Sequence, residues 1–420
     1  MIGSNRFKEL HRQQEQDFSR TRLLSFAGLV VSQINRMSKS LSVEISKFMG
    51  RFFGEETDYT KQAYSLSRLK LKAEAFISRK LVEDYYREGD YKHWQGFTLL
   101  ACDGSLLQLP QSPELTAHFG LAENKGRTMP MSRSSLLYDI ENEMVVDALP
   151  GRYSDDEQHM ALAHVDYLEQ LSLPGPCLLL LDRGYPSLWL LACLKQRKLD
   201  FLMRIPATFI GEARAFAESK NKDSWLSIDL LTPQRKKDAA LQKFVDPDEP
   251  ILQLRAVKIK LDNNQTELLL TSLEKVSLAT LKDLYHKRWG IETGIGFLKN
   301  VVEIENFSAK TVLGVCQDFH AAILASNLRM LLVEDAEQEL AIEQAGKNNK
   351  HSYRINRAVA LGLVKDQLAA LLLSTEPAEI IYQRLKKKIK RRKEAVKPHR
   401  KYPRKNPLSY KFHVNKRKVI

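Results

Sequence analysis

The stretch CLLLLD, residues 177–182, constrains the fold of this 420-residue chain more than any other feature. Its apolar run is continuous until Asp182 ends it, as expected of a strand that is buried on both faces of a sheet. The break Pro174-Gly175-Pro176 precedes it. A predicted helix (PSLWLLACLKQRKL) and a further predicted strand (DFLMRIP) follow it. We therefore expect an α/β fold.

The residues before this run predict the rest of the same core. FTLLACDGS is typical of a strand that ends at Asp103, and SSLLYD and MVVDALP predict two more strands, joined by the turn IENE. Ser154, followed by an acidic first turn at residues 155–157, predicts an N-cap and a helix that runs to about Leu171. Three strands, a helix, a strand, a helix and a strand are the element order of a ribonuclease-H-like α/β core.

Flanking segments have different patterns. The first ninety or so residues predict helices, while WLSIDLL, ILQLRAVKIKL and TELLLTSL predict a β-rich insertion with lysine-rich loops. FHAAILASNLRMLLVE and INRAVALGLVKDQLAALLL predict two apolar helices near the end. We expect an N-terminal helical DNA-binding domain (residues 1–92), followed by the first part of the core (93–205) and the insertion (206–280). The second part of the core (281–330), a C-terminal helical region (331–383) and a basic tail (384–420) complete the expected division.

Composition favours a soluble globular protein without membrane spans or disulfides. Hydrophobic residues make up 43% and charged residues 28%, and the longest aliphatic run, Leu178 to Leu181, is far too short to span a bilayer. The N-terminus has no apolar signal core, so we expect a cytoplasmic protein. The four cysteines form no C-x-x-C pair, which disfavours zinc ribbons and disulfide frameworks.

The net charge of +14 comes entirely from the tail. Residues 384–420 hold 17 Lys and Arg and one acid, Glu394, so the rest of the chain has a net charge of −2. A tail of this kind attracts polyanions, and we expect it to contact nucleic acid. The alternative is a solvated, disordered segment that aids solubility.

Residues 60–77, TKQAYSLSRLKLKAEAFI, predict one amphipathic helix. Rotation of about 100° per residue gives an apolar stripe (Leu66, Leu69, Ala73, Phe76, Ile77) beside a polar one (Lys61, Ser65, Arg68, Lys72). Such a helix could pack on a small bundle and present Lys61, Arg68 and Lys72 to DNA phosphates. An ordinary amphipathic surface helix would have the same pattern.

Residues 285–299, YHKRWGIETGIGFLK, predict a second helix with an unusual edge. With Tyr285 at 0°, the residues Arg288, Glu292 and Lys299 fall within roughly 60° of it, next to an apolar edge. A salt-bridged surface stripe with an i,i+4 pair between Arg288 and Glu292 would explain these charges. It would not explain three glycines within seven residues, each of which costs a helix about 1 kcal/mol relative to alanine. Gly296 lies beside the polar edge, where a DNA backbone could approach closely.

Three carboxylates are expected to converge at the end of the sheet. Asp103 and Asp182 end two strands that should be neighbours, and the helix that carries Glu292 should pack across them. Such a set suits Mg²⁺, with Mn²⁺ as a substitute. Two such ions, about 3.5–4 Å apart, can activate a water or a 3′-hydroxyl and stabilise the leaving oxygen of a phosphodiester. Each aspartate alone would more often be a strand-end cap or turn residue.

At these residues the sequence resembles the bacterial insertion-sequence DDE transposases of the family named after insertion sequence four. Tyr285, Arg288, Glu292 and Lys299 reproduce that family's Y-(2)-R-(3)-E-(6)-K signature, and LLLLDRGYPS and ACDGS resemble the blocks around its two aspartates. RTMPMSRSSLLYD, the region FSRTRLLSFAGLVVSQINRMSKSL and the basic tail are also similar to its members. The resemblance covers nearly the whole chain.

The resemblance implies roles for these residues. Asp103, Asp182 and Glu292 would be the catalytic, metal-binding triad, Arg288 and Lys299 would hold phosphates of the transposon end, and Tyr285 would contact DNA nearby. The implied chemistry is hydrolytic nicking at the ends of the element, followed by attack of the freed 3′-hydroxyl on target DNA. It implies a homodimer on paired ends of double-stranded DNA, in the cytoplasm and associated with the bacterial nucleoid. Some relatives form a hairpin intermediate and hold a flipped base with a tryptophan, for which Trp225 is the candidate here, with core packing as its alternative.

Two other functions are compatible with the sequence. One is a catalytically silent, transposase-derived DNA-binding protein that acts as a repressor or structural factor, which the intact carboxylates disfavour. The other is a structure-specific nuclease on the same core, which the Y-R-E-K set disfavours.

Overall fold

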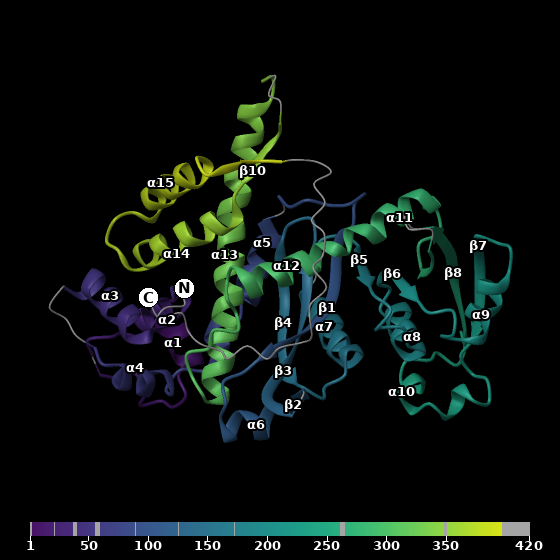
Figure 1. Ribbon diagram of the computed structural model, residues 1–420, viewed down its shortest axis with the longest axis horizontal. Coiled ribbons are helices and arrows are strands. Elements are labelled where there is room, and N and C mark those ends of the chain that lie inside the picture. Colours follow the sequence, from purple (N-terminus) through teal and green to yellow (C-terminus); the bar gives the residue numbers. More distant parts are fainter. Residues whose placement is uncertain are drawn as a thin grey trace.

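The computed structural model is built around one large mixed sheet with helices on both faces (Figure 1). The N-terminal and C-terminal helices gather on one side of it, and the insertion lies on the other (Figure 1). The structure describes residues 2–20, 22–36, 40–54, 59–88, 90–124, 126–171, 173–260, 265–347 and 351–396.

The first six strands form the centre of the sheet, in the order β2-β3-β1-β5-β6, with β4 paired to β3. The strand β1 runs parallel to β5, β5 runs parallel to β6, and β3 is antiparallel to both β1 and β4. Their bounds are β1 Thr98–Gln108, β2 Leu121–Asn124, β3 Arg127–Asp139, β4 Met144–Arg152, β5 Cys177–Leu181 and β6 Asp200–Ile205. All four leucines of β5 are buried, so the prediction from the CLLLLD run is confirmed.

The prediction that β1 ends at Asp103 is wrong, because this strand continues to Gln108. It pairs with β3 as far as Gln108, opposite Met131, but with β5 only from Thr98 to Ala101. Beyond Ala101, one edge of β1 is therefore free of β5. Asp103 lies where the strand loses this neighbour and its burial falls from buried to intermediate.

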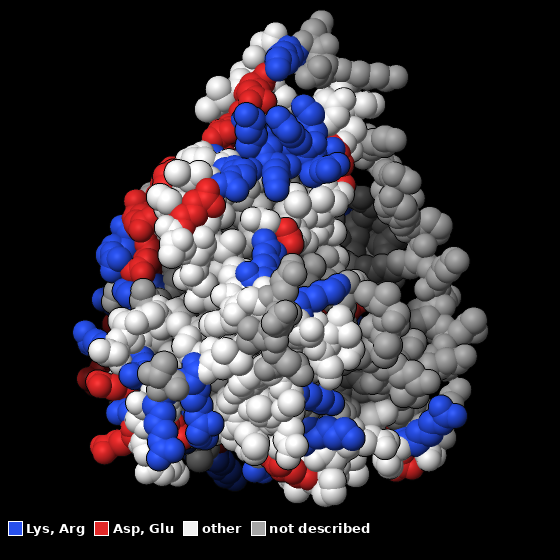
Figure 2. Space-filling view, turned by 90° about the vertical axis from the view of Figure 1, so that its left-hand side faces the viewer, with Lys and Arg blue, Asp and Glu red and all other residues white. Residues whose placement is uncertain are grey.

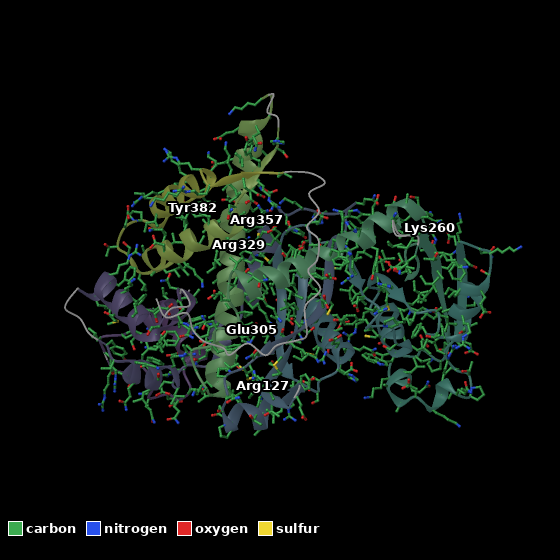
Figure 3. All side chains as sticks on the ribbon, viewed as in Figure 1. Arg127, Lys260, Glu305, Arg329, Arg357 and Tyr382 are labelled. Carbon is green, nitrogen blue, oxygen red and sulfur yellow. The ribbon has the colours of Figure 1, made fainter. Side chains whose placement is uncertain are left out.

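The insertion extends the central sheet. Its strands β7 (Asp223–Asp229), β8 (Ile251–Lys260) and β9 (Thr266–Thr271) pair in sequence, and β9 pairs antiparallel with β6. The predicted β-rich character is thus confirmed. Lys260, at the end of β8, lies on the opposite side of the molecule from the C-terminal helices (Figure 3). Short helices accompany these strands: α9 Gly211–Glu218, η2 Arg235–Lys237 and α10 Ala239–Gln242.

Different helices cover the two faces of the sheet. Leu100, Leu179 and other alternate strand residues pack against α7 (Glu157–Leu171) and α8 (Leu188–Gln196). Leu99, Leu178 and their alternates pack instead under α11 (Leu278–Lys287), α12 (Trp289–Asn300) and α13 (Val312–Gln344). The helix α7 begins later than predicted. The carboxylate of Asp156, and not the side chain of Ser154, accepts hydrogen bonds from the backbone N–H groups of residues 158 and 159.

The helix α13 connects the outer parts of the fold. It passes through the boundary that was expected at residues 330/331 and packs on α2 (Phe26–Ile34), α14 (Arg357–Leu373) and β4. Glu143, in the turn between β3 and β4, pairs with Arg329 of α13 and with Arg357 of α14. Arg329 and Arg357, both labelled in Figure 3, therefore converge on Glu143. Tyr382, also labelled there, donates to the carboxylate of Asp335 on α13. The remaining helices are α1 Asn5–His11, α2 Phe26–Ile34, α3 Leu41–Phe53, α4 Lys61–Arg68, η1 Ala73–Phe76, α5 Arg79–Glu88, α6 Pro113–Phe119, α14 Arg357–Leu373 and α15 Ala378–Lys390.

The basic tail begins inside folded structure. The helix α15 (Ala378–Lys390) buries Ile381, Leu385 and Ile389, and β11 (Lys393–Ala395) pairs with β10 (Tyr353–Ile355). Basic side chains gather in the upper part of the face shown in Figure 2, beside acidic ones. Lys386 and Lys390 both pair with Glu339 of α13. The rest of the tail, residues 397–420, lies outside the described residues. None of the helices among the described residues is long and apolar enough to cross a membrane.

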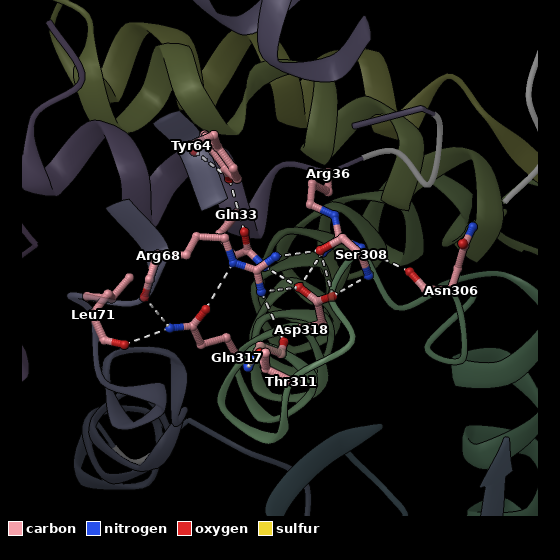
Figure 4. Close-up of polar contacts among 12 residues, drawn as sticks. Gln33, Arg36, Tyr64, Arg68, Leu71, Asn306, Ser308, Thr311, Gln317 and Asp318 are labelled. Carbon is pink, nitrogen blue, oxygen red and sulfur yellow. Dashed lines mark hydrogen bonds and ion pairs between the residues drawn. The ribbon is translucent and has the colours of Figure 1, made fainter. Parts of the chain in front are cut away.

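The single helix predicted for residues 60–77 is wrong. The helix α4 ends at Arg68, and the short η1 follows after a turn. Leu66 and Leu69, expected to be buried, are 55% and 50% exposed, whereas Arg68 is buried. Figure 4 shows the reason: Arg68 donates to the Asp318 carboxylate at 2.9 Å, to Gln317 at 3.0 Å and to the Gly314 carbonyl oxygen at 3.0 Å. Partners from α13, far along the chain, override the local apolar pattern.

Candidate active site

Strand register brings the two aspartates together. In the parallel pair, Ala101 lies opposite Leu180, and the same offset places Asp103 opposite Asp182, just beyond the last paired residues. Both carboxylates are oriented locally, since the Gly104 N–H donates to Asp103 Oδ1 at 2.8 Å and the Gly184 N–H donates to Asp182 Oδ1 at 2.7 Å. Side chains alternate along a strand, so Asp103 shares a face with Leu99 and Ala101, the face that α12 covers.

The segment that carries Glu292 is interrupted, although the sequence predicted one helix. The helix α11 ends at Lys287 and α12 starts at Trp289, with Arg288 between them in a helical conformation (φ −52°, ψ −30°). The predicted i,i+4 pair is confirmed: Arg288 Nη2 donates to Glu292 Oε1 at 2.8 Å. The other amino group, Nη1, lies 3.8 Å from Asp103 Oδ2. The buried guanidinium thus connects the carboxylates of Asp103 and Glu292.

The electrostatics of Asp103 show that negative charge gathers at this point. Burial raises the pKa of its carboxyl to about 6, and the charges of Asp182 and Glu292 act in the same direction. The Gly104 N–H and Arg288 act in the opposite direction. A carboxyl whose pKa is raised by neighbouring carboxylates is one that gains from a cation beside it.

Two of the three glycines in α12 are explained by close packing. A Cβ on Gly290 would lie 2.8 Å from Ile140 Cγ2, and a Cβ on Gly294 would lie 2.9 Å from Tyr138 Cζ. Both contacts are with β3 or the residue after it, so the glycines let α12 approach the sheet. A Cβ on Gly296 would meet nothing within 4 Å, so packing among the described residues does not require that glycine.

The other residues of the signature lie near the triad. Tyr285 is buried, its pKa is raised to about 12 by burial, and its hydroxyl has no hydrogen-bond partner among the described residues. Lys299 Nζ donates to the Leu106 carbonyl oxygen of β1 at 2.6 Å and lies 4.0 Å from Glu305 Oε1. Arg288 therefore lies at Asp103 and Lys299 at Leu106, both along the half-buried part of β1.

The predicted N-terminal DNA-binding set does not form one cationic face. Lys61 is exposed, but Arg68 is buried in the network around Asp318, and Lys72 donates to the Leu10 carbonyl oxygen at 3.2 Å. The assignment of Arg68 to DNA is thus wrong, because a buried carboxylate pairs with it. Core packing of Trp225 is also wrong, since its side chain on β7 is 48% exposed.

Sequence reasoning missed Glu157 and Arg133 at this site. Glu157 was noticed only as part of an acidic first turn, yet its carboxylate lies against Gly104 and Gly184, the glycines that orient the two aspartates. Arg133, on β3, donates to Glu157. The sequence signal that could have identified Glu157 is its position: it is an acidic residue at the start of α7, the helix that precedes β5 and its Asp182.

The donor set fits a hard divalent cation. In the part of the chain that is described, no three His, Cys, Asp or Glu side chains lie close enough together to hold a metal ion as they stand. Asp103, Asp182 and Glu292 nevertheless all supply carboxylate oxygens, the ligands that Mg²⁺ and Mn²⁺ prefer. Arg288 already supplies positive charge between Asp103 and Glu292.

Comparison with known proteins defines the class. Residues 94–328 match the family model described as a transposase DDE domain, which spans more than half of the chain, so the chain belongs to this family of DDE transposases. The family resemblance seen in the sequence is confirmed at that level.

Among individual proteins, the chain is 24% identical over 280 residues to transposase InsG for insertion sequence element IS4 of Escherichia coli (strain K12). That alignment covers 64% of this chain and 61% of the relative, so the chain spans less than two thirds of the relative's length. A solved structure, the cryo-EM structure of the piggyBac transposase synaptic complex with hairpin DNA, is similar with a TM-score of 0.46 and 10% identity, over 90% of this chain and 79% of that chain.

Proposed function

We propose that this chain is a transposase that cleaves the ends of its own insertion element and transfers the 3′-hydroxyl strand to target DNA. One observation carries the proposal: the β1–β5 register aligns Asp103 with Asp182, under a helix whose Glu292 shares an arginine with Asp103. The strand order β4-β3-β1-β5-β6 and the helices on both faces support a ribonuclease-H-like core for this chemistry.

Asp103, Asp182 and Glu292 would hold Mg²⁺, with Mn²⁺ as a substitute. When bound, the metal would lower the pKa of the attacking water or hydroxyl and stabilise charge on the leaving oxygen. Asp103 would be ionised for this task above pH 6, the region of its pKa. The N–H groups of Gly104 and Gly184 would keep one oxygen of each aspartate fixed.

The cations beside the triad would bind the DNA strand. Arg288 lies beside the carboxylates of Asp103 and Glu292, and it would hold a phosphate close to the reacting centre once a bound cation takes over those carboxylates. Lys299, partly exposed at the end of β1, would hold a neighbouring phosphate. The hydroxyl of Tyr285, without a partner among the described residues, would be available to DNA after a small movement.

The proposed partners are the double-stranded ends of the element and target DNA, bound by a homodimer in the cytoplasm and associated with the nucleoid. The tail would add affinity without sequence preference, since its 17 Lys and Arg exceed the net charge of the whole chain. The exposed Trp225 on β7 is compatible with a contact to an unstacked base.

The test is incubation of the purified full chain and Mg²⁺ with the DNA that flanks its own gene. Cleavage at the boundaries of inverted repeats would support the proposal. Binding of the same DNA without cleavage would favour the silent DNA-binding protein instead. Cleavage at branched structures regardless of sequence would favour a structure-specific nuclease.

A further inference from the structure

Glu157 lies between the part of β1 that carries Asp103 and the loop after β5 that carries Asp182. A Cβ on Gly104, next to Asp103, would lie 3.0 Å from Glu157 Oε1. A Cβ on Gly184 would lie 3.5 Å from Glu157 Oε2 and 3.1 Å from Asp182 Oδ1. Glu157 Oε2 and Asp182 Oδ1 therefore both lie beside Gly184.

The approach of Glu157 is opposite to that of Glu292. Asp103 faces α12, whereas the alternate position, Gly104, faces α7, whose first residue is Glu157. A glutamate from each covering layer thus reaches the same end of the sheet. The lack of a side chain at residue 104 is what lets the carboxylate of Glu157 come this close.

Each of these glutamates is held by an arginine. Arg133 of β3 donates through Nη1 to Glu157 Oε1, as Arg288 donates to Glu292 Oε1. Arg133 also lies 3.4 Å through Nε from the Tyr153 carbonyl oxygen, which fixes its direction. The pair is partly exposed, with 24% of the Arg133 side chain and 33% of the Glu157 side chain accessible. Arg133 contacts Glu157 Oε1, whereas Glu157 Oε2 is the oxygen that lies beside Gly184.

We propose that Glu157 is a fourth carboxylate of the cation site, which shares a divalent cation with Asp182, and that Arg133 holds it in place until the cation binds. This inference rests on the proposed function, because the cation is the one that Asp103, Asp182 and Glu292 would hold. The site then has four carboxylates from four separate elements, enough oxygens for two divalent cations rather than one.

The experiment is a titration of Mn²⁺ into the full-length chain without DNA. Electron paramagnetic resonance measures the concentration of free Mn²⁺ at each step, which gives the affinity of the chain for the ion. Glu157→Gln should weaken Mn²⁺ binding about tenfold or more. The matched control is Glu169→Gln, the same change on the same helix, where the side chain pairs with Arg197 at 3.4 Å; it should bind as the parent chain does.

A second variant separates ligation from a structural role. Arg133→Gln removes the cation that competes with Mn²⁺ for Glu157, so this single change should leave the Mn²⁺ affinity unchanged or raise it. When Glu157→Gln is also present, Arg133→Gln should not raise the Mn²⁺ affinity. If Glu157 only supports the fold, both single changes should weaken binding together. That result would overturn the inference.

The outcomes also separate this inference from the proposed function. If Asp182→Asn abolishes Mn²⁺ binding and Glu157→Gln leaves it unchanged, only the proposed role of Glu157 is overturned. Binding that neither change affects, or no binding to the parent chain, would overturn the proposed cation site together with the role of Glu157.

Discussion

Arg288 donates to Glu292 at 2.8 Å across one turn of helix, and its guanidinium is buried. The same group lies 3.8 Å from Asp103, so an internal cation lies between two of the carboxylates that we propose bind the metal. A helix interrupted at Arg288 and glycines that draw α12 onto β3 create this arrangement. The negative charges at this end of the sheet are therefore held together at a cost to stability, which leads to the first prediction.

Asp103→Asn should stabilise the protein in the absence of divalent cations. The pKa of Asp103 is about 6 in the folded state and 3.8 as its ordinary value, so its ionisation opposes folding increasingly from pH 4 to 6 and fully above. At pH 7.5 the gain should be up to about 3 kcal/mol. It should fall to about 0.5 kcal/mol near pH 4, where the carboxyl is protonated in the folded state and only partly ionised in the unfolded state. Urea unfolding at both pH values measures it, and equal gains at both would contradict the assigned cause.

Gly294→Ala and Gly296→Ala should have opposite effects on stability. The first adds a Cβ 2.9 Å from Tyr138 Cζ in a buried contact, which should cost about 1–3 kcal/mol. The second meets nothing within 4 Å and should gain up to about 1 kcal/mol from helix propensity. Thermal unfolding of the two variants beside the parent chain measures these changes in stability. Similar losses of stability in both variants would mean that α12 is not packed as described. Weaker DNA binding by the stable Gly296→Ala chain would fit a backbone that approaches there.

Arg68→Met should unfold the protein more easily, because it leaves Asp318 buried with only part of its counter-charge. Burial acts to raise the pKa of the Asp318 carboxyl, yet Arg36 and Arg68 hold it below the ordinary value. Loss of one partner of such a pair should cost about 3 kcal/mol or more in urea unfolding. The control Lys61→Met, on the exposed side of the same helix, should change stability by less than about 0.5 kcal/mol. Normal stability with weakened DNA binding in Arg68→Met would restore its assignment to DNA.

Removal of residues 397–420 should flatten the salt dependence of DNA binding. This cut leaves α15 intact, whereas a cut at residue 384 would remove buried Leu385 and Ile389. The removed segment holds nine Lys and Arg, whose contacts with phosphates would release counterions. Binding titrations at several salt concentrations measure the slope. A chain with the same segment in scrambled order should keep the full slope, and an unchanged slope after removal would make the segment a solubility aid.

The fold was largely predictable because its signals are local. An uninterrupted apolar strand, the alternating strands of the insertion and the apolar helix α14 each depend on neighbouring residues, and each was found within a few residues of its observed bounds. The helix α13 was also predicted, from residues 319–334, but it extends well beyond them at both ends, from Val312 to Gln344. The end of β1 was misplaced because pairing with β3, a tertiary effect, extends it beyond Asp103.

The parts of the site that could not be predicted depend on distant partners. The local sequence predicts that Arg68 belongs to an exposed polar stripe, and only the fold shows that Asp318, 250 residues away, lies beside it. Glu157 reads as a helix-start acid until the strand register brings Gly104 and Gly184 against it. By contrast, the pair Arg288 and Glu292 was predictable, since one turn of helix separates them.

The central claim is that Glu292 acts with Asp103 and Asp182 on one metal-dependent cleavage. The most direct measurement is a nicking assay with Glu292→Gln, paired with a gel-shift titration on the same oligonucleotide from the end of the element. The change keeps the size of the side chain and removes the charge that a divalent cation needs. We expect nicking to fall to background while binding is kept or strengthened, because a negative charge near phosphate has gone. Robust nicking by this variant would contradict the account and leave Glu292 as a partner of Arg288 alone.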